Sequence, residues 1–269
     1  MRPKDPKNTT EASSLLNRRA FLSGAAAAAA GLVGQRAFAI GRPTRLRLAT
    51  LALPGAGSFP REGVPEVWAF ELGRFTSVEV SGEVPHLGPS DPKLFEHPLI
   101  ILAGATGFAP LSAEHRAQLG LFLRSGGMLF IDDISGLHES DFAASVQREL
   151  KAIFPTEPLA RLDRGHALHR SFFLIQRVVG RLALRPYVEG ITLGDISPVV
   201  FSRNDLLGAL ARDNAGVPLY ACVPGGEDQR MWAFKLSINM VMYALTLNYK
   251  LDATHVRALL EKRRGVYDQ

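Results

Sequence analysis

Apolar stretches alternate along the chain with amphipathic ones, a pattern that indicates strands alternating with helices. Residues 99–103 and 128–131 are apolar at every position. Such continuous runs are typical of parallel strands that are covered on both faces. Together with less regular apolar runs and one short alternating segment, the pattern predicts strands over residues 46–53, 77–80, 99–103, 128–131 and 196–201.

Helical spacing and end signals lie between and after these strands. Ser112 is a suitable N-cap for a helix over residues 113–124, which a pair of glycines ends. A second helix is predicted by an apolar stripe with a spacing of four residues, and another begins at a proline. Two more close the chain. The stripe consists of Phe142, Val146 and Leu150, and the proline is Pro65. The two helices that close the chain are predicted over residues 230–247 and 254–263.

Strands that alternate with helices favour an α/β fold with three layers, in which a mostly parallel sheet has helices on both faces. We expect one such domain over residues 40–269, because 230 residues suffice for one well-buried core but not comfortably for two. The apolar segment of residues 231–247 contains Lys235 and Asn239. We therefore expect a buried helix there and no membrane span in the mature chain.

The first 39 residues have the features of a twin-arginine export signal. Arg18 and Arg19 precede a short apolar run over residues 24–34, and Ala37 and Ala39 form the small-x-small pattern of a cleavage site. The run is about half as long as the ~20 residues that a membrane anchor needs. The sequence therefore predicts export to the periplasm or another extracytoplasmic space.

Removing this segment changes the charge balance. The chain has 31 Lys and Arg and 26 Asp and Glu, and residues 1–39 hold six of the bases and two of the acids. The remaining 25 bases and 24 acids leave a net charge of +1, which gives no support to nucleic-acid binding. Cys222, the only cysteine, lies in an apolar segment and is expected to be a small buried side chain.

Polar or glycine-rich loops follow three of the predicted strands. Ligands of open parallel sheets bind outside the carboxyl ends of the strands, so loops of neighbouring strands would form one crevice. The alternative is that the aspartates only cap the helices that follow them. The candidate pocket residues are Gly104, Gly107, Asp132, Asp133, His138, His166, Arg170, Ser202, Asn204 and Asp205.

No established ligand or nucleophile motif accompanies these candidates. The acids and histidines at the loops, with Asp141 and His169 added, match no metal-ligand spacing, and we predict no metal. The chain lacks a G-x-S-x-G elbow, and the glycines after residue 103 form neither a phosphate-binding loop nor a dinucleotide fingerprint. We therefore predict no cofactor.

The order of motifs from about Pro98 to the C-terminus resembles the bacterial family called domain of unknown function 4159. The matching pieces are the strand at 99–103, residues 111–114, the strand ending in Asp132-Asp133, and then residues 141–142, 148–150, 166, 170–173, 202, 204–206 and 235–246. Departures from the family pattern are Gly165 and Ala167 around His166, Arg203 in place of a proline, and residues 207–210.

This resemblance implies a fold like that of class I glutamine amidotransferases, or flavodoxin-like, without the cysteine nucleophile. It also implies assembly partners in the cell envelope, such as membrane proteins of a MoxR and von Willebrand factor A type system. Our first hypothesis is an exported, non-catalytic binding or assembly module. The alternative is a metal- or carboxylate-dependent hydrolase of an envelope polymer or glycan, with Asp132, Asp133 and Asp205 as acid/base or metal-binding groups and His166 assisting.

Overall fold

A seven-stranded, mostly parallel sheet forms the centre of the protein. The structure, a computed structural model, describes residues 45–54 and 59–267. The strand order is β2-β1-β3-β4-β7-β6-β5; the first five are parallel, whereas β6 and β5 are antiparallel to their neighbours. The strands are β1 (Leu48–Leu51), β2 (His86–Leu87), β3 (Leu99–Gly104), β4 (Met128–Asp133), β5 (Ala160–Arg161), β6 (Glu189–Leu193) and β7 (Ile196–Ser202).

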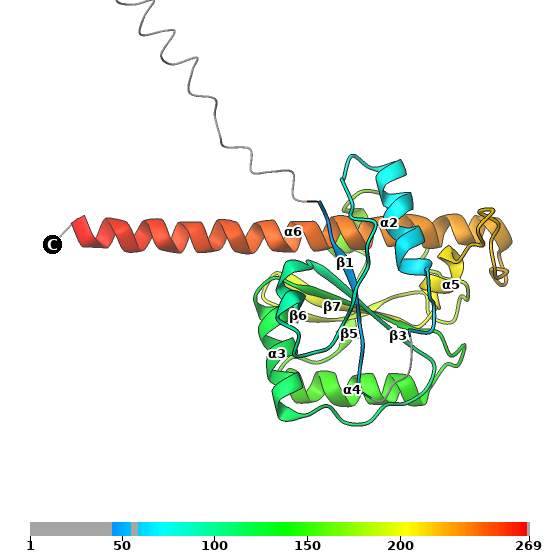
Figure 1. Ribbon diagram of the computed structural model, residues 1–269, viewed down its shortest axis with the longest axis horizontal. Helices are drawn as coiled ribbons and strands as arrows, with labels where there is room; N and C mark the ends of the chain where they lie inside the picture. Colours follow the sequence, from blue (N-terminus) through cyan, green and yellow to red (C-terminus); the bar gives the residue numbers. More distant parts are fainter. Residues whose placement is uncertain (1–44, 55–58, 268–269) are drawn as a thin grey trace, which may run out of the picture. The chain divides into compact units, whose positions relative to one another are not determined.

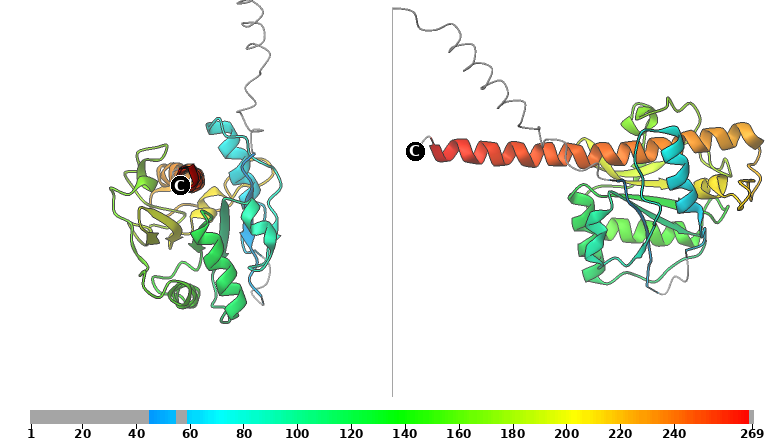
Figure 2. Two further views of the ribbon diagram at one scale, coloured as in Figure 1. Left: turned by 90° about the vertical axis from the view of Figure 1, so that its left-hand side faces the viewer. Right: turned by 45° about the horizontal axis from the view of Figure 1, so that its top comes forward.

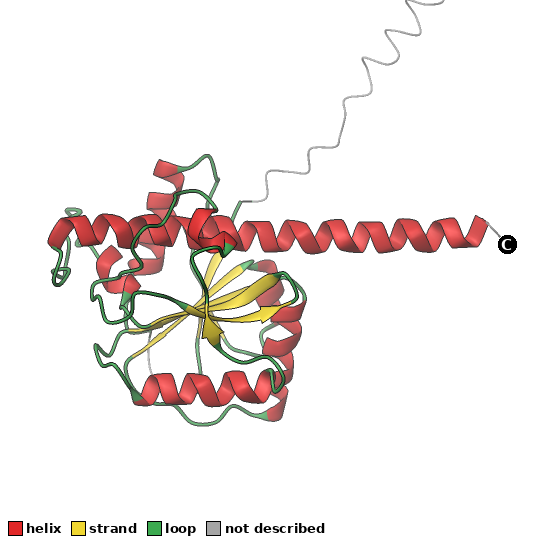
Figure 3. Ribbon diagram, turned by 180° about the vertical axis from the view of Figure 1, so that it is seen from behind, coloured by secondary structure: helices red, strands yellow, loops and turns green. Residues whose placement is uncertain are grey.

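Helices cover both faces of this sheet, as Figures 1 and 3 show. One face packs against α2, α5 and α6, and the other against α3 and α4. The bounds are α2 (Val64–Phe75), α3 (Ala113–Arg124), α4 (Asp141–Ile153), α5 (Leu206–Leu210) and α6 (Gly226–Tyr267), with 3₁₀ turns η1 (Pro92–Glu96) and η2 (Ala167–Arg170). The predicted α/β architecture with a mostly parallel sheet is confirmed.

The alternation of side chains along the strands explains the two cores. Ile101 and Phe130 point to the face that holds Trp68 of α2, whereas Ile100 and Ile131 point to the face that holds Phe142 of α4. Both faces of the central strands are thus buried, which is why their sequences are apolar without interruption. The two helix layers can be followed on either side of the strands in Figure 2.

Two predicted helices begin at serine caps. The Ser112 hydroxyl accepts a hydrogen bond from the His115 amide at 3.1 Å, and the Ser140 hydroxyl accepts one from the Ala143 amide at 3.0 Å. Each cap satisfies an amide that has no partner inside its helix, and such a cap stabilises a helix by about 1 kcal/mol. The bounds predicted for α3 are those of the structure.

Two predictions about local structure are wrong, and some elements were not predicted. Residues 77–80 form no strand, because only Val80 pairs, in a single bridge with Leu46; the sheet edge is formed by β2 instead. The short strands β5 and β6 and the helix α5 were not predicted. The two expected C-terminal helices are one helix, α6, since neither glycine nor proline lies between residues 247 and 254 to end it.

The export signal predicted over residues 1–39 lies outside the described residues. No helix in the described part of the chain is long and apolar enough to cross a membrane.

Candidate functional site

The carboxyl ends of β1, β3, β4 and β7 lie at one edge of the sheet, because these strands are parallel. Gly104 pairs in register with Asp133, and Asp132 pairs with Ser202. The strands that precede the three candidate loops, β3, β4 and β7, are therefore parallel neighbours. The side chains at this edge nevertheless have very different surroundings, and only one part of the edge is open.

Asp132 lies wholly inside the protein and holds the start of α5. Its two carboxylate oxygens accept hydrogen bonds from the amides of Leu206 and Leu207 at 2.9 and 2.8 Å. Two effects raise the pKa of Asp132 to about 8: burial, which is the larger, and the nearby carboxylate of Asp205. The hydrogen bonds from the two amides and from Ser202 oppose this rise. The carboxyl group of Asp132 has no exposure to solvent.

Asp205 is equally buried and binds two arginines. Its carboxylate caps α5 through the Gly208 amide at 2.9 Å and accepts hydrogen bonds from Arg61, the shorter at 2.6 Å, and from Arg181. Asp205 also has a left-handed backbone, with φ of 50°, which aspartate tolerates better than most residues. The carboxylate is thus fully used in holding three segments together.

Asp133 organises the loop between β4 and α4. One oxygen accepts the Ser135 amide at 2.9 Å, and the other accepts the hydroxyl of Ser140, the N-cap of α4, at 2.5 Å. The alternative that the aspartates cap the helices that follow them holds for Asp205 alone, because Ser140 caps α4 and Asp132 binds the amides at the start of α5. All three are at most 1% exposed.

The segment of the chain before β6 covers the carboxyl ends of β4 and β7. The amides of Leu182 and Arg185 donate to the backbone oxygen and the side-chain oxygen of Asn204 at 2.9 and 2.8 Å. Gly180 lies so close that a Cβ atom there would be 2.2 Å from the Asn204 carbonyl oxygen. Ser202, whose hydroxyl accepts the Asn204 amide at 3.2 Å, is buried beneath the same segment.

The remaining candidates do not join these aspartates in a site. His166 contacts Ser197 at 3.0 Å, near the amino end of β7, which is about 16 Å along the strand from Ser202 at 3.3 Å per residue. The Nδ1 atom of His166 accepts a hydrogen bond from the Leu168 amide, and burial lowers the pKa of His166. His138 and Arg170 are exposed.

An open cavity of about 450 Å³ lies where β1 and β3 end. In the order β2-β1-β3-β4 the succession of strands reverses between β1 and β3, and α/β proteins bind ligands at such a reversal. Of the predicted pocket residues, Gly104 and Gly107 line this cavity. Its described lining consists of Thr50, Leu51, Ala52, Leu53, Phe59, Pro60, Glu62, His86, Leu102, Ala103, Gly104, Ala105, Thr106, Gly107, Phe108 and Phe142.

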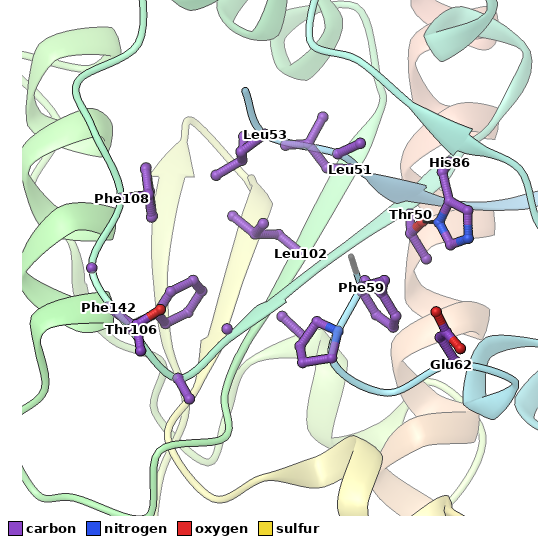
Figure 4. A pocket seen from close by; sticks show the side chains of 16 residues that line it. Thr50, Leu51, Leu53, Phe59, Glu62, His86, Leu102, Thr106, Phe108 and Phe142 are labelled. Atoms are coloured by element: carbon purple, nitrogen blue, oxygen red, sulfur yellow. Dashed lines mark hydrogen bonds between the residues drawn. The ribbon is translucent and has the colours of Figure 1, made fainter. Parts of the chain in front are cut away.

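Figure 4 shows the polar groups on two sides of this cavity. Thr50, near the end of β1, is hydrogen-bonded through its hydroxyl to Nδ1 of His86, and Glu62 and Phe59 lie on the same side of the cavity. Thr106 lies on the opposite side, beside Phe142. The cavity thus combines apolar walls with a few hydrogen-bonding groups, which is the usual composition of a small-molecule site.

Sequence reasoning missed Thr50, Glu62 and His86. Thr50 is the one polar residue of β1 and is fully buried, so a polar position inside an apolar run was the available signal. His86 belongs to a strand of two residues, too short for any pattern to reveal.

Nothing in the described residues favours metal or thiol chemistry at this edge. No group of three or more His, Cys, Asp or Glu in the described part of the chain is placed to hold a metal ion. Cys222 is buried, and burial raises the pKa of its thiol, which makes it a poor nucleophile.

The sequence was compared with families and with curated proteins. The model of a family described as "Domain of unknown function (DUF4159)" matches residues 60–245. The match begins before the resemblance seen from Pro98 onward, and it takes in α2 and β2. No curated protein matches the chain.

Proposed function

Because the chain belongs to the DUF4159 family, whose function is unknown, we propose a function from the site itself: a non-catalytic ligand-binding module of the cell envelope. Its ligand enters the cavity between β1 and β3. The observation that carries the proposal is the division of the sheet edge. Asp132, Asp133 and Asp205 are used inside the protein, whereas Glu62, His86 and Thr106 line open space.

The envelope part of the proposal is supported by the sequence of residues 1–39. An arginine pair, a short apolar run and a small-x-small site favour twin-arginine export. The amidotransferase-like or flavodoxin-like fold is also a proposal, supported by the order β2-β1-β3-β4 of the parallel strands. We also propose that the protein assembles with membrane proteins of a MoxR and von Willebrand factor A type system, which the family resemblance implies.

A hydrolase that uses the three aspartates has less support. Such an enzyme needs its carboxylates to reach substrate or a metal ion, and these carboxylates have no exposed surface with which to do so. His166, the expected assistant, contacts Ser197 near the other end of β7. We therefore favour binding over catalysis.

A fragment screen followed by protein-observed NMR tests the proposal. We expect weakly binding fragments to shift the amide signals of residues 104–108. Thr106→Trp, which places a large side chain at the mouth of the cavity, should abolish these shifts. Ala109→Trp is the matched control, because Ala109 is exposed in the same loop but does not line the cavity. The absence of any fragment at residues 104–108, or equal binding to both variants, would overturn the proposal.

Export is tested separately by cell fractionation. We expect the unmodified protein in the periplasmic fraction. When Arg18 and Arg19 are both replaced by lysine, we expect the uncut precursor in the cytoplasm. Equal export of the two forms would contradict the twin-arginine prediction.

A further inference from the structure

The charges around the cavity indicate what kind of ligand fits it. Glu62 is the one carboxylate among the described lining residues, and no lysine or arginine lines the cavity in the described part of the chain. An anionic ligand such as a phosphate or a carboxylate would therefore face Glu62 with no lysine or arginine in the described lining to compensate it. A cationic ligand would find a partner.

The neighbouring Arg61 does not change this balance. Its guanidinium donates to the buried carboxylate of Asp205 at 2.6 Å and lies 4.5 Å from the ring centroid of Tyr220. Arg61 is thus held outside the cavity by a carboxylate that it shares with Arg181, while the next residue along the chain, Glu62, lines the cavity. The exposed Glu62 has no ion-pair partner within the described residues.

Aromatic rings add a second element of cation recognition. Phe59, Phe108 and Phe142 line the cavity, and Phe59 and Glu62 lie on the same side of it in Figure 4. The face of an aromatic ring attracts an organic cation, with a free energy of about 0.5–2 kcal/mol that depends on how far the cation is desolvated. A guanidinium, that of Arg148, already lies 5.7 Å from the centroid of the Phe108 ring.

We propose that the cavity binds a small organic ammonium ion, held between the carboxylate of Glu62 and the ring of Phe59. His86, which is exposed on the same side and hydrogen-bonded through Nδ1 to the buried Thr50, supplies its other ring nitrogen for a hydroxyl group of the ligand. This inference rests on the proposed binding function and adds the chemical class of the ligand.

A purely structural role for Glu62 is the competing explanation. Glu62 immediately precedes Gly63, the N-cap of α2, where a negative charge is favourable to the helix dipole. Glu66 lies in the first turn of the same helix, is exposed and does not line the cavity. Glu66→Gln is therefore a matched control that weakens the same dipole interaction without touching the cavity.

The experiment compares three probes of nearly the same shape: choline, its neutral analogue 3,3-dimethylbutan-1-ol, and the anion 3,3-dimethylbutanoate. Each is titrated into the protein while the amide signals of Phe59, Glu62 and residues 104–108 are followed by NMR. We expect choline to bind about tenfold more tightly than the neutral analogue, which corresponds to about 1.4 kcal/mol. The anion should bind most weakly.

Glu62→Gln should abolish the preference for choline, and Glu66→Gln should leave it unchanged. The inference is overturned if the neutral or anionic probe binds as tightly as choline, or if Glu62→Gln has no effect. Both of those outcomes leave the proposed binding cavity intact. If neither these probes nor the fragments shift residues 104–108, the proposed function fails as well.

Discussion

The ion pairs of Asp205 offer a sharp test of how the sheet edge is held together. Asp205→Asn removes the negative charge but keeps the shape of the side chain. The amide oxygen can still accept the hydrogen bond of the Gly208 amide, and asparagine tolerates the left-handed backbone at this position. The change therefore isolates the interactions with Arg61 and Arg181, whose side chains are 11% and 24% exposed.

The expected loss follows from the burial of these groups. Removing one partner of a buried ion pair destabilises a protein by about 3–5 kcal/mol, because the other charge stays buried. One feature reduces this figure, since both arginines reach some solvent. We expect a loss of about 2–4 kcal/mol. At about 2–4 °C per kcal/mol for a domain of this size, Tm should fall by about 4–16 °C.

Thermal unfolding followed by circular dichroism measures this loss against a matched control. Arg177 and Asp228 form an ion pair with the same 2.6 Å separation as Arg61 and Asp205, but their side chains are 48% and 60% exposed. Asp228→Asn should therefore cost at most about 1 kcal/mol. Equal changes of Tm in Asp205→Asn and Asp228→Asn would refute the argument that burial gives the Asp205 pairs their importance.

Three further changes test other parts of the edge and its supports. Burial raises the pKa of Asp132 from 3.8 to about 8, so the stability that this group contributes is present below pH 3.8 and is lost as the pH rises toward 8. Asp132→Asn should therefore reduce the dependence of the free energy of unfolding on pH, measured by urea titration between pH 5 and 8. The pKa of Glu149 is lowered overall. Burial, the largest single effect, raises this pKa, but hydrogen bonds from Arg116 and then Arg148 together lower it by more. Its contribution is therefore present above 4.5 and lost as the pH falls through the folded value, and Glu149→Gln should remove this acid sensitivity. Gly104→Ala would place a Cβ atom 2.3 Å from Phe142, and we expect a loss of about 1–3 kcal/mol in urea unfolding; an unchanged free energy of unfolding would contradict the packing at the cavity floor.

Local signals predicted the central part of the fold because local chemistry determines it. The strands β3 and β4 are apolar throughout since both of their faces are buried, and Ser112 marks the start of α3 by capping it. The two-residue strand β2 has no such signal. It forms because the chain after α2 returns to the edge of β1, and that pairing of Thr50 with His86 depends on distant residues.

The candidate site was predictable only in part for the same reason. The sequence indicated the edge of the sheet at which the cavity lies, since parallel strands place their carboxyl ends together, and it named Gly104 and Gly107, which line that cavity. It did not show that the side chains after β4 and β7 are turned inward. At β7 this depends on the segment containing Leu182 and Arg185, which joins no strand or helix and carries no pattern that predicts where it packs.

The filled part and the open part of the edge are physically connected through Arg61. Its guanidinium is held by Asp205 on the filled side, and its neighbours Pro60 and Glu62 form a wall of the cavity on the open side. A loop over a binding site must hold its shape against solvent, and a buried ion pair fixes a loop better than an exposed one. The aspartate that the sequence suggested as a chemical group therefore contributes to the site as a support for its wall, which explains why it can be buried without loss of the binding function proposed here.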